Sequence, residues 1–343
     1  MRALVLVKHG PPEEALKIEE RPDPVPGPGQ VLIDVKAAGI NFADIVARVG
    51  LYPDAPKPPA VLGYEVAGVV EAVGEGVEGI QPGQRVVGLT RFNGFAEKAV
   101  TEAKNVLSLP DGWSFEQGAA LPVNYGTAYA AIDFLAAVRP GETVLVHAAA
   151  GGVGIAALQL LRARGAEAIG TASGWKHDAI RAQGAAHTID YRTQDVKEEV
   201  MRITNGRGVY VVLDALGEFR LSYSLLTTGG RMVAYGASKL VTGDRRNMVK
   251  AVRGVVTMPR FNPLKLMSDT KSVMGLNLLH WWDKRGSIEE LTRPLIEMAE
   301  RGEISPVVAE TFPLERAAEA HRFMQERKNI GKVVLTVGDG RPS

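Results

Sequence analysis

The stretch Thr143-Val-Leu-Val-His-Ala-Ala-Ala-Gly-Gly-Val-Gly-Ile-Ala-Ala-Leu-Gln-Leu-Leu161 decides how this chain folds, because it carries no charge over nineteen residues. A charge-free run of this length is a candidate membrane span. Three glycines interrupt its middle, however, and the polar residues His147 and Gln159 lie within it. Its β-branched residues also gather at one end. We therefore interpret the stretch as two shorter elements joined by a glycine-rich turn.

The two halves fit a strand followed by a helix. Thr143–His147 is a short apolar run, typical of a strand buried on both faces of a parallel sheet. Ile155–Arg164, followed by Gly165, has the pattern of a helix with a glycine stop. The turn between them has Ala149 in place of the first glycine of G-x-G-x-x-G, so its setting carries the interpretation. Such a turn holds a pyrophosphate on backbone N–H groups, and we expect a dinucleotide to bind Gly151, Gly152, Val153 and Gly154.

Length and composition limit the class of protein. A chain of 343 residues is too long for one core and suggests two domains. It is 45% hydrophobic and 23% charged, as expected of a soluble globular protein, and its net charge of +1 argues against general binding to nucleic acid or membranes. Without cysteine it has no disulfide, thiolate zinc site, iron–sulfur ligand or cysteine nucleophile. The five apolar residues between Arg2 and Lys8 are too few for a signal peptide, so we expect a cytoplasmic protein.

The first part of the chain, to about residue 123, is rich in short strand patterns separated by turn signals. The predicted strands are Ala3–Val7, Val31–Ala37, Val66–Val73, Arg85–Gly88, Phe95–Val100 and Val106–Ser108. Closely spaced short strands suggest a partly closed barrel. The four prolines between Pro53 and Pro59 predict a stiff, irregular loop.

From Thr143 strands alternate with helices, which predicts a doubly wound parallel sheet, the Rossmann arrangement of an α/β protein. After the first strand and helix, the predicted strands are Glu167–Thr171, His187–Asp190, Val209–Asp214, Arg231–Tyr235 and Val273–Asn277. The predicted helices between them include Lys176–Gln183 and Asp195–Thr204.

The C-terminal part holds two helical patterns, Ser287–Arg301 and Leu314–Glu326, and a last strand, Lys332–Val337. We expect that strand to return to the N-terminal domain. The predicted domains are therefore 1–123 with 279–343, forming the β-rich substrate domain, and 124–278, forming the dinucleotide-binding domain.

One segment, from Lys239 to Lys265, has an unusual charge balance, with seven basic residues against the single acid Asp244. We favour a solvated helix face. The alternative is a patch for an anionic partner or a membrane surface.

The end of the second strand bears on the choice of cofactor. An NAD site places Asp or Glu about 20 residues beyond the glycines to accept the ribose 2′-hydroxyl. Here the segment Gly170–Lys176 has no carboxylate, while Ser173 can hydrogen-bond a phosphate and Lys176 can neutralise it. We therefore predict NADPH, although Lys176 is also compatible with a plain surface helix.

The sequence gives no pattern for a metal site or a serine nucleophile. The six histidines are scattered without ligand spacing, and His147 fits a buried histidine of the core. No serine lies in a nucleophile-elbow sequence.

Several motifs together resemble the zinc-free medium-chain dehydrogenase/reductases, the quinone oxidoreductase or zeta-crystallin group. They are Gly39-Ile-Asn41-Phe-Ala-Asp44, Leu62-Gly63-Tyr64-Glu65-Val-Ala-Gly68, Pro82-Gly83-Gln-Arg85-Val and the glycine turn. Within this group, Phe261–Met267 and Ser272–Leu278 resemble the branch named for the synaptic vesicle membrane protein VAT-1. Zinc-dependent relatives carry Gly-His-Glu where this chain has Gly63-Tyr64-Glu65. The resemblance implies a GroES-like β-rich domain beside the Rossmann domain, metal-independent hydride transfer and a homodimer.

The resemblance also implies roles for residues outside the glycine turn. Asn41 and Tyr52 would line the cleft between the domains where nicotinamide meets substrate, and are the candidate catalytic residues. The other implied cofactor contacts are Asn41 itself, Thr127, Ser173, Lys176, Tyr191, Gly236, Ser238, Asn277, Asn329 and Lys332. Each asparagine is also compatible with a turn cap, and each tyrosine with an ordinary half-buried aromatic residue.

In such a site the cofactor supplies hydride, and the protein supplies proximity and donors for the substrate oxygen. A quinone or an α,β-unsaturated carbonyl fits this chemistry, because Tyr52 or Asn41 would stabilise the developing oxyanion. Two alternatives remain open: an NADPH-binding sensor or adaptor with little turnover, and a zinc-independent alcohol or polyketide enoyl reductase.

Overall fold

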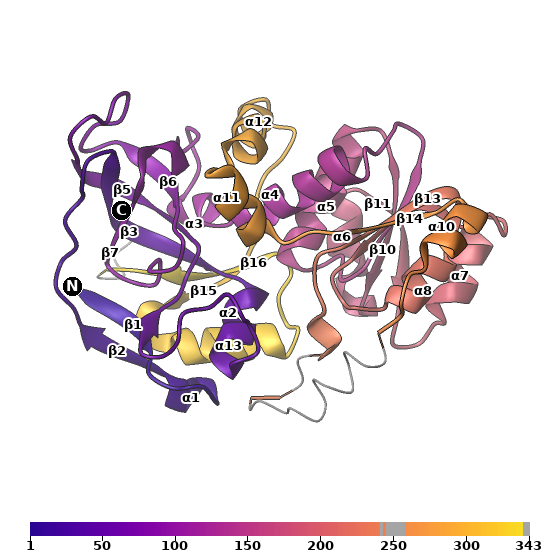
Figure 1. Ribbon diagram of the computed structural model, residues 1–343, viewed down its shortest axis with the longest axis horizontal. Helices are drawn as coiled ribbons and strands as arrows, with labels where there is room; N and C mark the ends of the chain where they lie inside the picture. Colours follow the sequence, from indigo (N-terminus) through magenta and orange to yellow (C-terminus); the bar gives the residue numbers. More distant parts are fainter. Residues whose placement is uncertain (241–242, 245–257, 339–343) are drawn as a thin grey trace. The chain divides into compact units, whose positions relative to one another are not determined.

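The chain folds as two compact units, shown in the computed structural model of Figure 1, which describes residues 1–240, 243–244 and 258–338. The described residues of the first unit are 1–123, 243–244 and 282–338. Those of the second are 124–240 and 258–281. Each unit has its own sheet and its own core.

The first unit is built on strands that mostly pair antiparallel. One sheet has the order β15-β16-β3-β5-β6-β8, with β7 also paired to β3, and a smaller sheet has the order β2-β1-β4. The strands are β1 (Arg2–Leu6), β2 (Leu16–Glu20), β3 (Gln30–Ile40), β4 (Ala60–Val61), β5 (Glu65–Val73), β6 (Arg85–Leu89), β7 (Lys98–Glu102), β8 (Val106–Ser108), β15 (Val308–Pro313) and β16 (Lys332–Thr336). The predicted β-rich first domain is therefore present, with β2, β4 and β15 in addition.

Strand β3 organises this sheet because it pairs with β5, β7 and β16. The pairing of Val333 with Ile40 brings the C-terminal strand back to the N-terminal domain, as the sequence predicts. The core between the strands and α3 (Phe115–Gly118) combines the small residues Ala37, Ala67 and Ala119 with the larger Val87, Leu109 and Val334. Small side chains let the helix lie close to the sheet.

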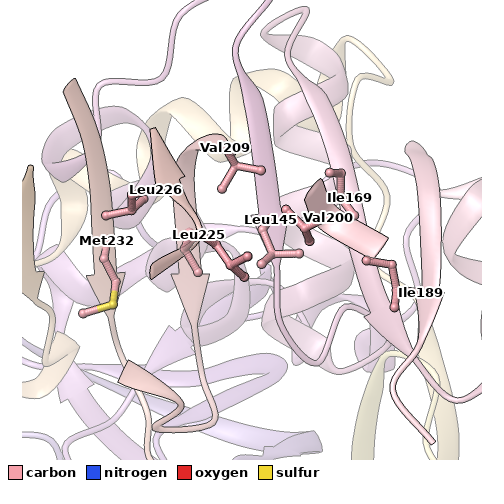
Figure 2. Packing of buried hydrophobic residues seen from close by; sticks show 9 residues of the cluster. Leu145, Ile169, Ile189, Val200, Val209, Leu225, Leu226 and Met232 are labelled. Atoms are coloured by element: carbon pink, nitrogen blue, oxygen red, sulfur yellow. The ribbon is translucent and has the colours of Figure 1, made fainter. Parts of the chain in front are cut away.

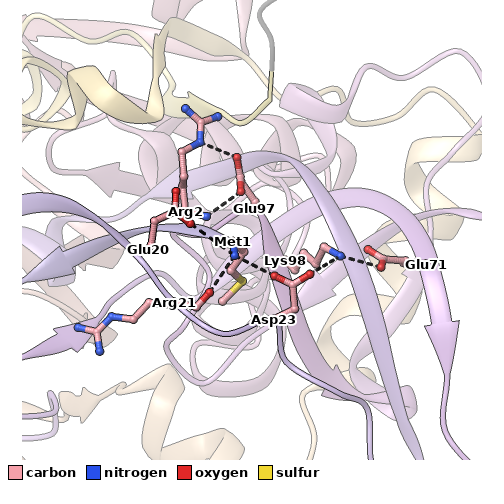
Figure 3. Close-up of polar contacts among 8 residues, drawn as sticks. All are labelled: Met1, Arg2, Glu20, Arg21, Asp23, Glu71, Glu97 and Lys98. Atoms are coloured by element: carbon pink, nitrogen blue, oxygen red, sulfur yellow. Dashed lines mark hydrogen bonds and ion pairs between the residues drawn. The ribbon is translucent and has the colours of Figure 1, made fainter.

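The N-terminus is held by a network of charges at the edge of the first unit (Figure 3). The Met1 amine donates to the carbonyl of Arg21 and to the carboxylate of Asp23, both at 2.8 Å. Lys98 bridges Asp23 and Glu71, also at 2.8 Å. These side chains are partly or largely exposed, so each pair contributes little stability.

The second unit is a six-stranded parallel sheet with the order β11-β10-β9-β12-β13-β14, the doubly wound arrangement that the sequence predicts. Its strands are β9 (Thr143–Val146), β10 (Glu167–Ala172), β11 (Ala185–Asp190), β12 (Val209–Asp214), β13 (Leu226–Ala234) and β14 (Ser272–Gly275). Figure 2 shows Leu145 of β9 packed among Ile169, Val200 and Val209, all fully buried. Burial of both sheet faces explains the continuous apolar run at Thr143.

The helices of the two units join and cover these strands. In chain order they are α1 (Pro12–Ala15), α2 (Phe42–Val49), α3, α4 (Pro122–Tyr129), a π-helical turn (Ala130–Leu135), α5 (Gly152–Ala163), α6 (His177–Ala182), α7 (Val196–Ile203), α8 (Phe219–Ser224), α10 (Pro263–Asp269), α11 (Leu278–Arg285), α12 (Glu289–Glu300) and α13 (Ala317–Gln325). No helix of the described residues is long and apolar enough to cross a membrane.

Several predicted boundaries differ from the structure, and two of them concern residues of the candidate site. Helix α5 begins at Gly152, three residues before the predicted start, because Gly151 already has the extended backbone of an N-cap. Strand β14 ends at Gly275, so Asn277 does not continue the strand; its side-chain oxygen accepts the N–H groups of Leu279 and His280 at the start of α11.

Most of the basic segment 239–265 lies outside the described residues, so neither interpretation of its charge is tested. At its described ends, Lys239 pairs with Glu218 and Lys265 pairs with Asp269. Asp244 belongs to the first unit and pairs with Arg322.

Candidate functional site

In the glycine turn between β9 and α5, neighbouring atoms lie too close to Gly152 and Gly154 to leave room for a side chain. A Cβ at Gly154 would lie 2.5 Å from the carbonyl oxygen of Ala148, so this glycine lets α5 pack against the end of β9. A Cβ at Gly152 would lie 2.2 Å from the amide nitrogen of Asn124 on α4. The first turn of α5 thus begins against the strand end, where its backbone N–H groups and helix dipole suit a pyrophosphate.

The residues predicted to bind the 2′-phosphate gather at the end of β10. The hydroxyl groups of Ser173 and Tyr191 lie 3.3 Å apart, and the backbone N–H of Lys176 donates to the carbonyl of Ser173 at 2.9 Å. The Lys176 side chain is buried, with its ammonium 4.8 Å from the ring centre of the exposed Trp175. The two hydroxyl groups lie together and Lys176 follows on the same turn, so this segment holds the kinds of group that bind a phosphate monoester.

An acid also lies here, which the local sequence does not reveal. A Cβ at Gly174 would be 2.7 Å from a carboxylate oxygen of Asp190, at the end of the neighbouring strand β11. The other Asp190 oxygen accepts the N–H of Arg192 at 3.0 Å. The region therefore contains a carboxylate as well as an ammonium. Whether it prefers a ribose 2′-phosphate or a ribose 2′-hydroxyl depends on which of these two charges has the stronger effect.

Two loops that follow β12 and β13 are joined to each other in the second unit. Gly236 faces the carbonyl of Ala215, to which a Cβ would approach within 2.7 Å, and the N–H of Ser238 donates to the same carbonyl at 3.2 Å. Buried Asp214 accepts the N–H groups of Leu216 and Gly217 at 2.8 and 2.9 Å. The predicted cofactor residues Gly236 and Ser238 therefore lie on a loop with a fixed backbone.

The other predicted residues of the second unit differ in their surroundings. Thr127 is buried on α4, whereas Asn277 is exposed and caps α11, which agrees with the turn-cap alternative. His147 is buried, with Nδ1 3.3 Å from the hydroxyl of Thr171, and burial lowers its pKa while the carboxylate of Asp214 opposes that shift. A neutral core histidine is the simplest description of His147.

The first unit contains a buried polar cluster around Asn41. The Lys332 ammonium donates to a carboxylate oxygen of Glu65 at 2.5 Å and to the amide oxygen of Asn41 at 2.7 Å. The Asn41 amide nitrogen donates to the same Glu65 oxygen at 3.0 Å. The second Glu65 oxygen accepts the N–H of Val123 at 2.8 Å, in the first turn of α4. Hydrogen bonds thus hold both the oxygen and the nitrogen of the Asn41 side-chain amide.

Asp44 extends this cluster, and the buried Tyr64 directly precedes Glu65 in sequence. Asp44, on α2, is fully buried and accepts the N–H of Asn41 at 2.8 Å. Burial raises the pKa of Asp44 to about 7, against the opposing effect of its hydrogen bond from Asn41. Tyr64 is buried against Phe92, and burial, together with Asp44 and Tyr52, raises the pKa of its hydroxyl well above the usual range.

The chain resembles known proteins over nearly its full length. Residues 27–114 match the alcohol dehydrogenase GroES-like domain, and residues 183–335 match the family described as zinc-binding dehydrogenase. The synaptic vesicle membrane protein VAT-1 homolog of Rattus norvegicus is 40% identical over 343 residues, which cover 98% of this chain and 84% of the relative. The chain belongs to the medium-chain dehydrogenase/reductase superfamily, in its quinone oxidoreductase-like group.

Two solved structures of this superfamily are similar to the chain. The Escherichia coli quinone oxidoreductase complexed with NADPH has a TM-score of 0.85 and 32% identity, over 98% of this chain and all of that one (100%). The CurK enoyl reductase has a TM-score of 0.84 and 32% identity, over 98% and 99% of the two chains. The first unit is accordingly a GroES-like domain, and the second a Rossmann-like sheet domain.

Some of the predicted site residues form hydrogen bonds with other residues of the protein. Asn329 donates to the carbonyl of Gly331 at 2.9 Å within the turn before β16. The Lys332 ammonium is held by Glu65 and Asn41, so a direct contact with cofactor would require it to change partners. Tyr52 is half-buried just after α2. The roles of these residues remain predictions.

Glu65 and Asp44 are the members of the cluster that sequence reasoning did not assign to the site. Both lie in the motifs that carry the family resemblance, yet neither pattern shows that the carboxylates are fully buried. A signal was available, because an acid at the start of an apolar strand such as β5 needs a partner if it is buried. Among the described residues, no three His, Asp or Glu side chains gather as metal ligands.

Proposed function

We propose that this protein is a metal-independent NADPH-dependent reductase that transfers hydride to a quinone or an α,β-unsaturated carbonyl. The observation that carries the proposal is the glycine turn at Gly152–Gly154 with Ser173, Lys176 and Tyr191 gathered at the end of the neighbouring strand. Relatives described as a quinone oxidoreductase with NADPH and as an enoyl reductase support this class of reaction.

In this proposal the chain binds the cofactor, orients the reacting groups and donates a hydrogen bond to the substrate. The first turn of α5 binds the pyrophosphate, and Lys176 with Ser173 and Tyr191 binds the 2′-phosphate. NADPH, when bound, supplies the hydride. Tyr52 donates a hydrogen bond to the oxygen that becomes negative, because the Asn41 amide is already engaged with Glu65 and Lys332. Asn41 then has mainly an orienting role.

Quinones and enones suit such a site better than simple ketones. They are already activated electrophiles, so a neutral donor such as the Tyr52 hydroxyl suffices, whereas an unactivated ketone needs a Lewis acid or a stronger acid. The carboxylate of Asp190 is the feature that opposes a phosphate. We propose that the buried ammonium of Lys176 outweighs it, since a charge-assisted hydrogen bond contributes about 1.5–3 kcal/mol.

Titration of NADPH and NADH into the wild type, Lys176→Ala and Lys197→Ala tests the cofactor preference. Lys197 is an exposed lysine of α7 and serves as the matched control. We expect NADPH to bind about ten- to a hundredfold more tightly than NADH, and Lys176→Ala to remove that difference. Equal affinities in the wild type would contradict the assignment.

A panel of quinones, enones and aldehydes with NADPH tests the reaction. We expect quinones or enones to be reduced and simple aldehydes to react poorly. Tight NADPH binding without turnover on any acceptor would instead favour a sensor or adaptor.

A further inference from the structure

Helix α2 lies between the two candidate catalytic residues, because Asn41 is its N-cap and Tyr52 follows shortly after its last residue. The helix ends at Gly50, which has a left-handed backbone with a φ of 83°. A Cβ at Gly50 would lie 2.9 Å from the ring of His9, so the chain leaves α2 in close contact with that ring. The position of Tyr52 therefore depends on how the end of α2 is held.

The end of α2 is held by Arg48, whose side chain is fully buried. Its guanidinium donates to the carbonyl of Gly10, and the N–H of Gly10 donates to the carbonyl of Arg48 at 3.2 Å. A second nitrogen of the guanidinium donates to the amide oxygen of Gln325 on α13 at 2.7 Å. Arg48 thus fixes α2 both to the turn before α1 and to α13.

A buried guanidinium needs a negative partner, and Asp244 supplies it. One Asp244 oxygen lies 3.4 Å from the Arg48 guanidinium and also accepts the side-chain N–H of Gln325 at 3.2 Å. The other oxygen accepts from Arg322, which itself pairs with Glu13 at 2.8 Å. Among the described residues, no second carboxylate forms an ion pair with Arg48.

Asp244 is also the single acid of the basic segment from Lys239 to Lys265. Its side chain is only 23% exposed and pairs with two arginines, Arg48 and Arg322. A lysine or arginine at this position would face two like charges, which accounts for an acid within a basic run. The proposed function does not by itself assign a role to this acid.

We propose that Asp244, acting through Arg48, is a positioning residue of this reductase that fixes the end of α2 and with it the hydroxyl of Tyr52. This inference rests on the proposed function, in which Tyr52 donates a hydrogen bond to the oxygen that becomes negative. Neither Asp244 nor Arg48 touches the substrate. A displacement of about 1 Å in a reacting group can cost roughly a hundredfold in rate, so a loosened α2 should slow hydride transfer without weakening NADPH binding.

Single-turnover hydride transfer tests this role in Asp244→Asn and in the control Glu319→Gln. Glu319 is exposed and pairs with Arg316 at the start of α13, so its variant removes another acid–arginine pair of that helix without touching Arg48. Asparagine retains an acceptor for Gln325, so Asp244→Asn should fold. We expect it to bind NADPH with the wild-type Kd and to transfer hydride about three- to tenfold more slowly, while Glu319→Gln matches the wild type. A wild-type rate in Asp244→Asn would overturn the proposal.

The Tyr52→Phe background shows whether the effect passes through Tyr52. Phenylalanine has no hydroxyl to position, so Asp244→Asn should not slow the Tyr52→Phe protein any further. The same slowing in both backgrounds would mean that Asp244 acts by another route, and the proposal would fall. Asp244→Glu keeps the negative charge and should recover part of the rate that Asp244→Asn loses.

Fluorine NMR follows Tyr52 without any turnover. In protein labelled with meta-fluorotyrosine, the Tyr52 resonance is the one that Tyr52→Phe removes. We expect Asp244→Asn to shift or broaden that resonance and Glu319→Gln to leave it unchanged. An unchanged resonance in Asp244→Asn would rule out the positioning role. If the wild type reduces no quinone or enone, the proposed function falls, and this spectrum still decides whether Asp244 positions Tyr52.

Discussion

Lys332 and Glu65 form a buried ion pair, with the ammonium 2.5 Å from the carboxylate, although the two residues are 267 positions apart in sequence. The pair joins the first residue of β16 to the first residue of β5. Gly39 leaves the space for it, because a Cβ there would lie 2.6 Å from the Lys332 side chain and 2.8 Å from Glu65. The ion pair therefore ties the returning C-terminal strand to the N-terminal domain.

Removing one partner of this pair should be more harmful than removing both. We expect Lys332→Met and Glu65→Gln each to destabilise the protein by about 3–5 kcal/mol, because each leaves a buried group unpaired. The double variant should lose less than the sum. Urea unfolding of the four proteins gives the coupling energy. Lys98→Met, which breaks the partly exposed pairs of Figure 3, is the control and should cost about 1 kcal/mol or less. Additive losses would contradict the account.

The stability of the protein should depend on pH through Asp44. Its pKa is about 7 in the folded state and near 3.8 when unfolded, so the folded state binds more protons between these values. Stability from this group is complete below the unfolded pKa and is lost as pH rises through about 7. Asp44→Asn should remove up to roughly 4 kcal/mol of this dependence. Urea unfolding at pH values on both sides of the window measures it, and a variant with the wild-type pH dependence would refute the prediction.

His321 predicts a pH dependence of the opposite sign. It is fully buried on α13, neither ring nitrogen has a hydrogen-bond partner among the described residues, and burial beside Arg48 lowers its pKa to about 3. Stability is therefore complete above the unfolded value of about 6.5 and is lost as pH falls towards 3. We expect His321→Leu to be at least as stable as the wild type at neutral pH and clearly more stable near pH 5. Thermal melting at the two pH values measures the change in Tm that His321→Leu causes. The same change at both pH values would contradict the prediction.

The glycine turn should not accept a methyl group at Gly154. A Cβ there would lie 2.5–2.6 Å from the backbone of Ala148 and Ala149, so α5 must move away from β9. Overpacking of this kind costs about 1–3 kcal/mol, and we expect NADPH affinity to fall by roughly tenfold or more. Gly275→Ala, at a glycine with no atom within 4 Å of its Cβ and no positive φ, is the matched control. Normal NADPH binding by Gly154→Ala would show that the turn does not hold the cofactor.

Local patterns predicted most of the architecture. The apolar run at Thr143 predicted β9 because a strand buried on both faces needs apolar residues at every position. The alternation that followed predicted the parallel sheet, and Lys332–Val337 predicted the strand that pairs with β3. These features depend on neighbouring residues or on general topology rules.

The charged parts of the candidate site were harder to predict. Asp190 and Gly174 meet because β10 and β11 are neighbours, and a sequence does not show which loop ends face each other. Glu65 and Lys332 are distant in sequence, and the burial of Asp44 depends on the packing of α2. Gly152 was expected to serve the pyrophosphate, but the amide of Asn124 also occupies the space that a side chain there would need. Such contacts follow from tertiary packing.

Single-turnover mixing of the NADPH-loaded protein with a quinone or an enone tests the proposed hydride transfer most directly, with the nicotinamide absorbance as the readout. We predict that the wild type oxidises its bound NADPH, and that Tyr52→Phe binds NADPH normally but transfers hydride about ten- to a hundredfold more slowly. Asn41→Ala should also be slower, because it removes the group that Glu65 and Lys332 hold in place. Failure of the wild-type protein to oxidise NADPH with any quinone or enone would contradict the proposed hydride transfer.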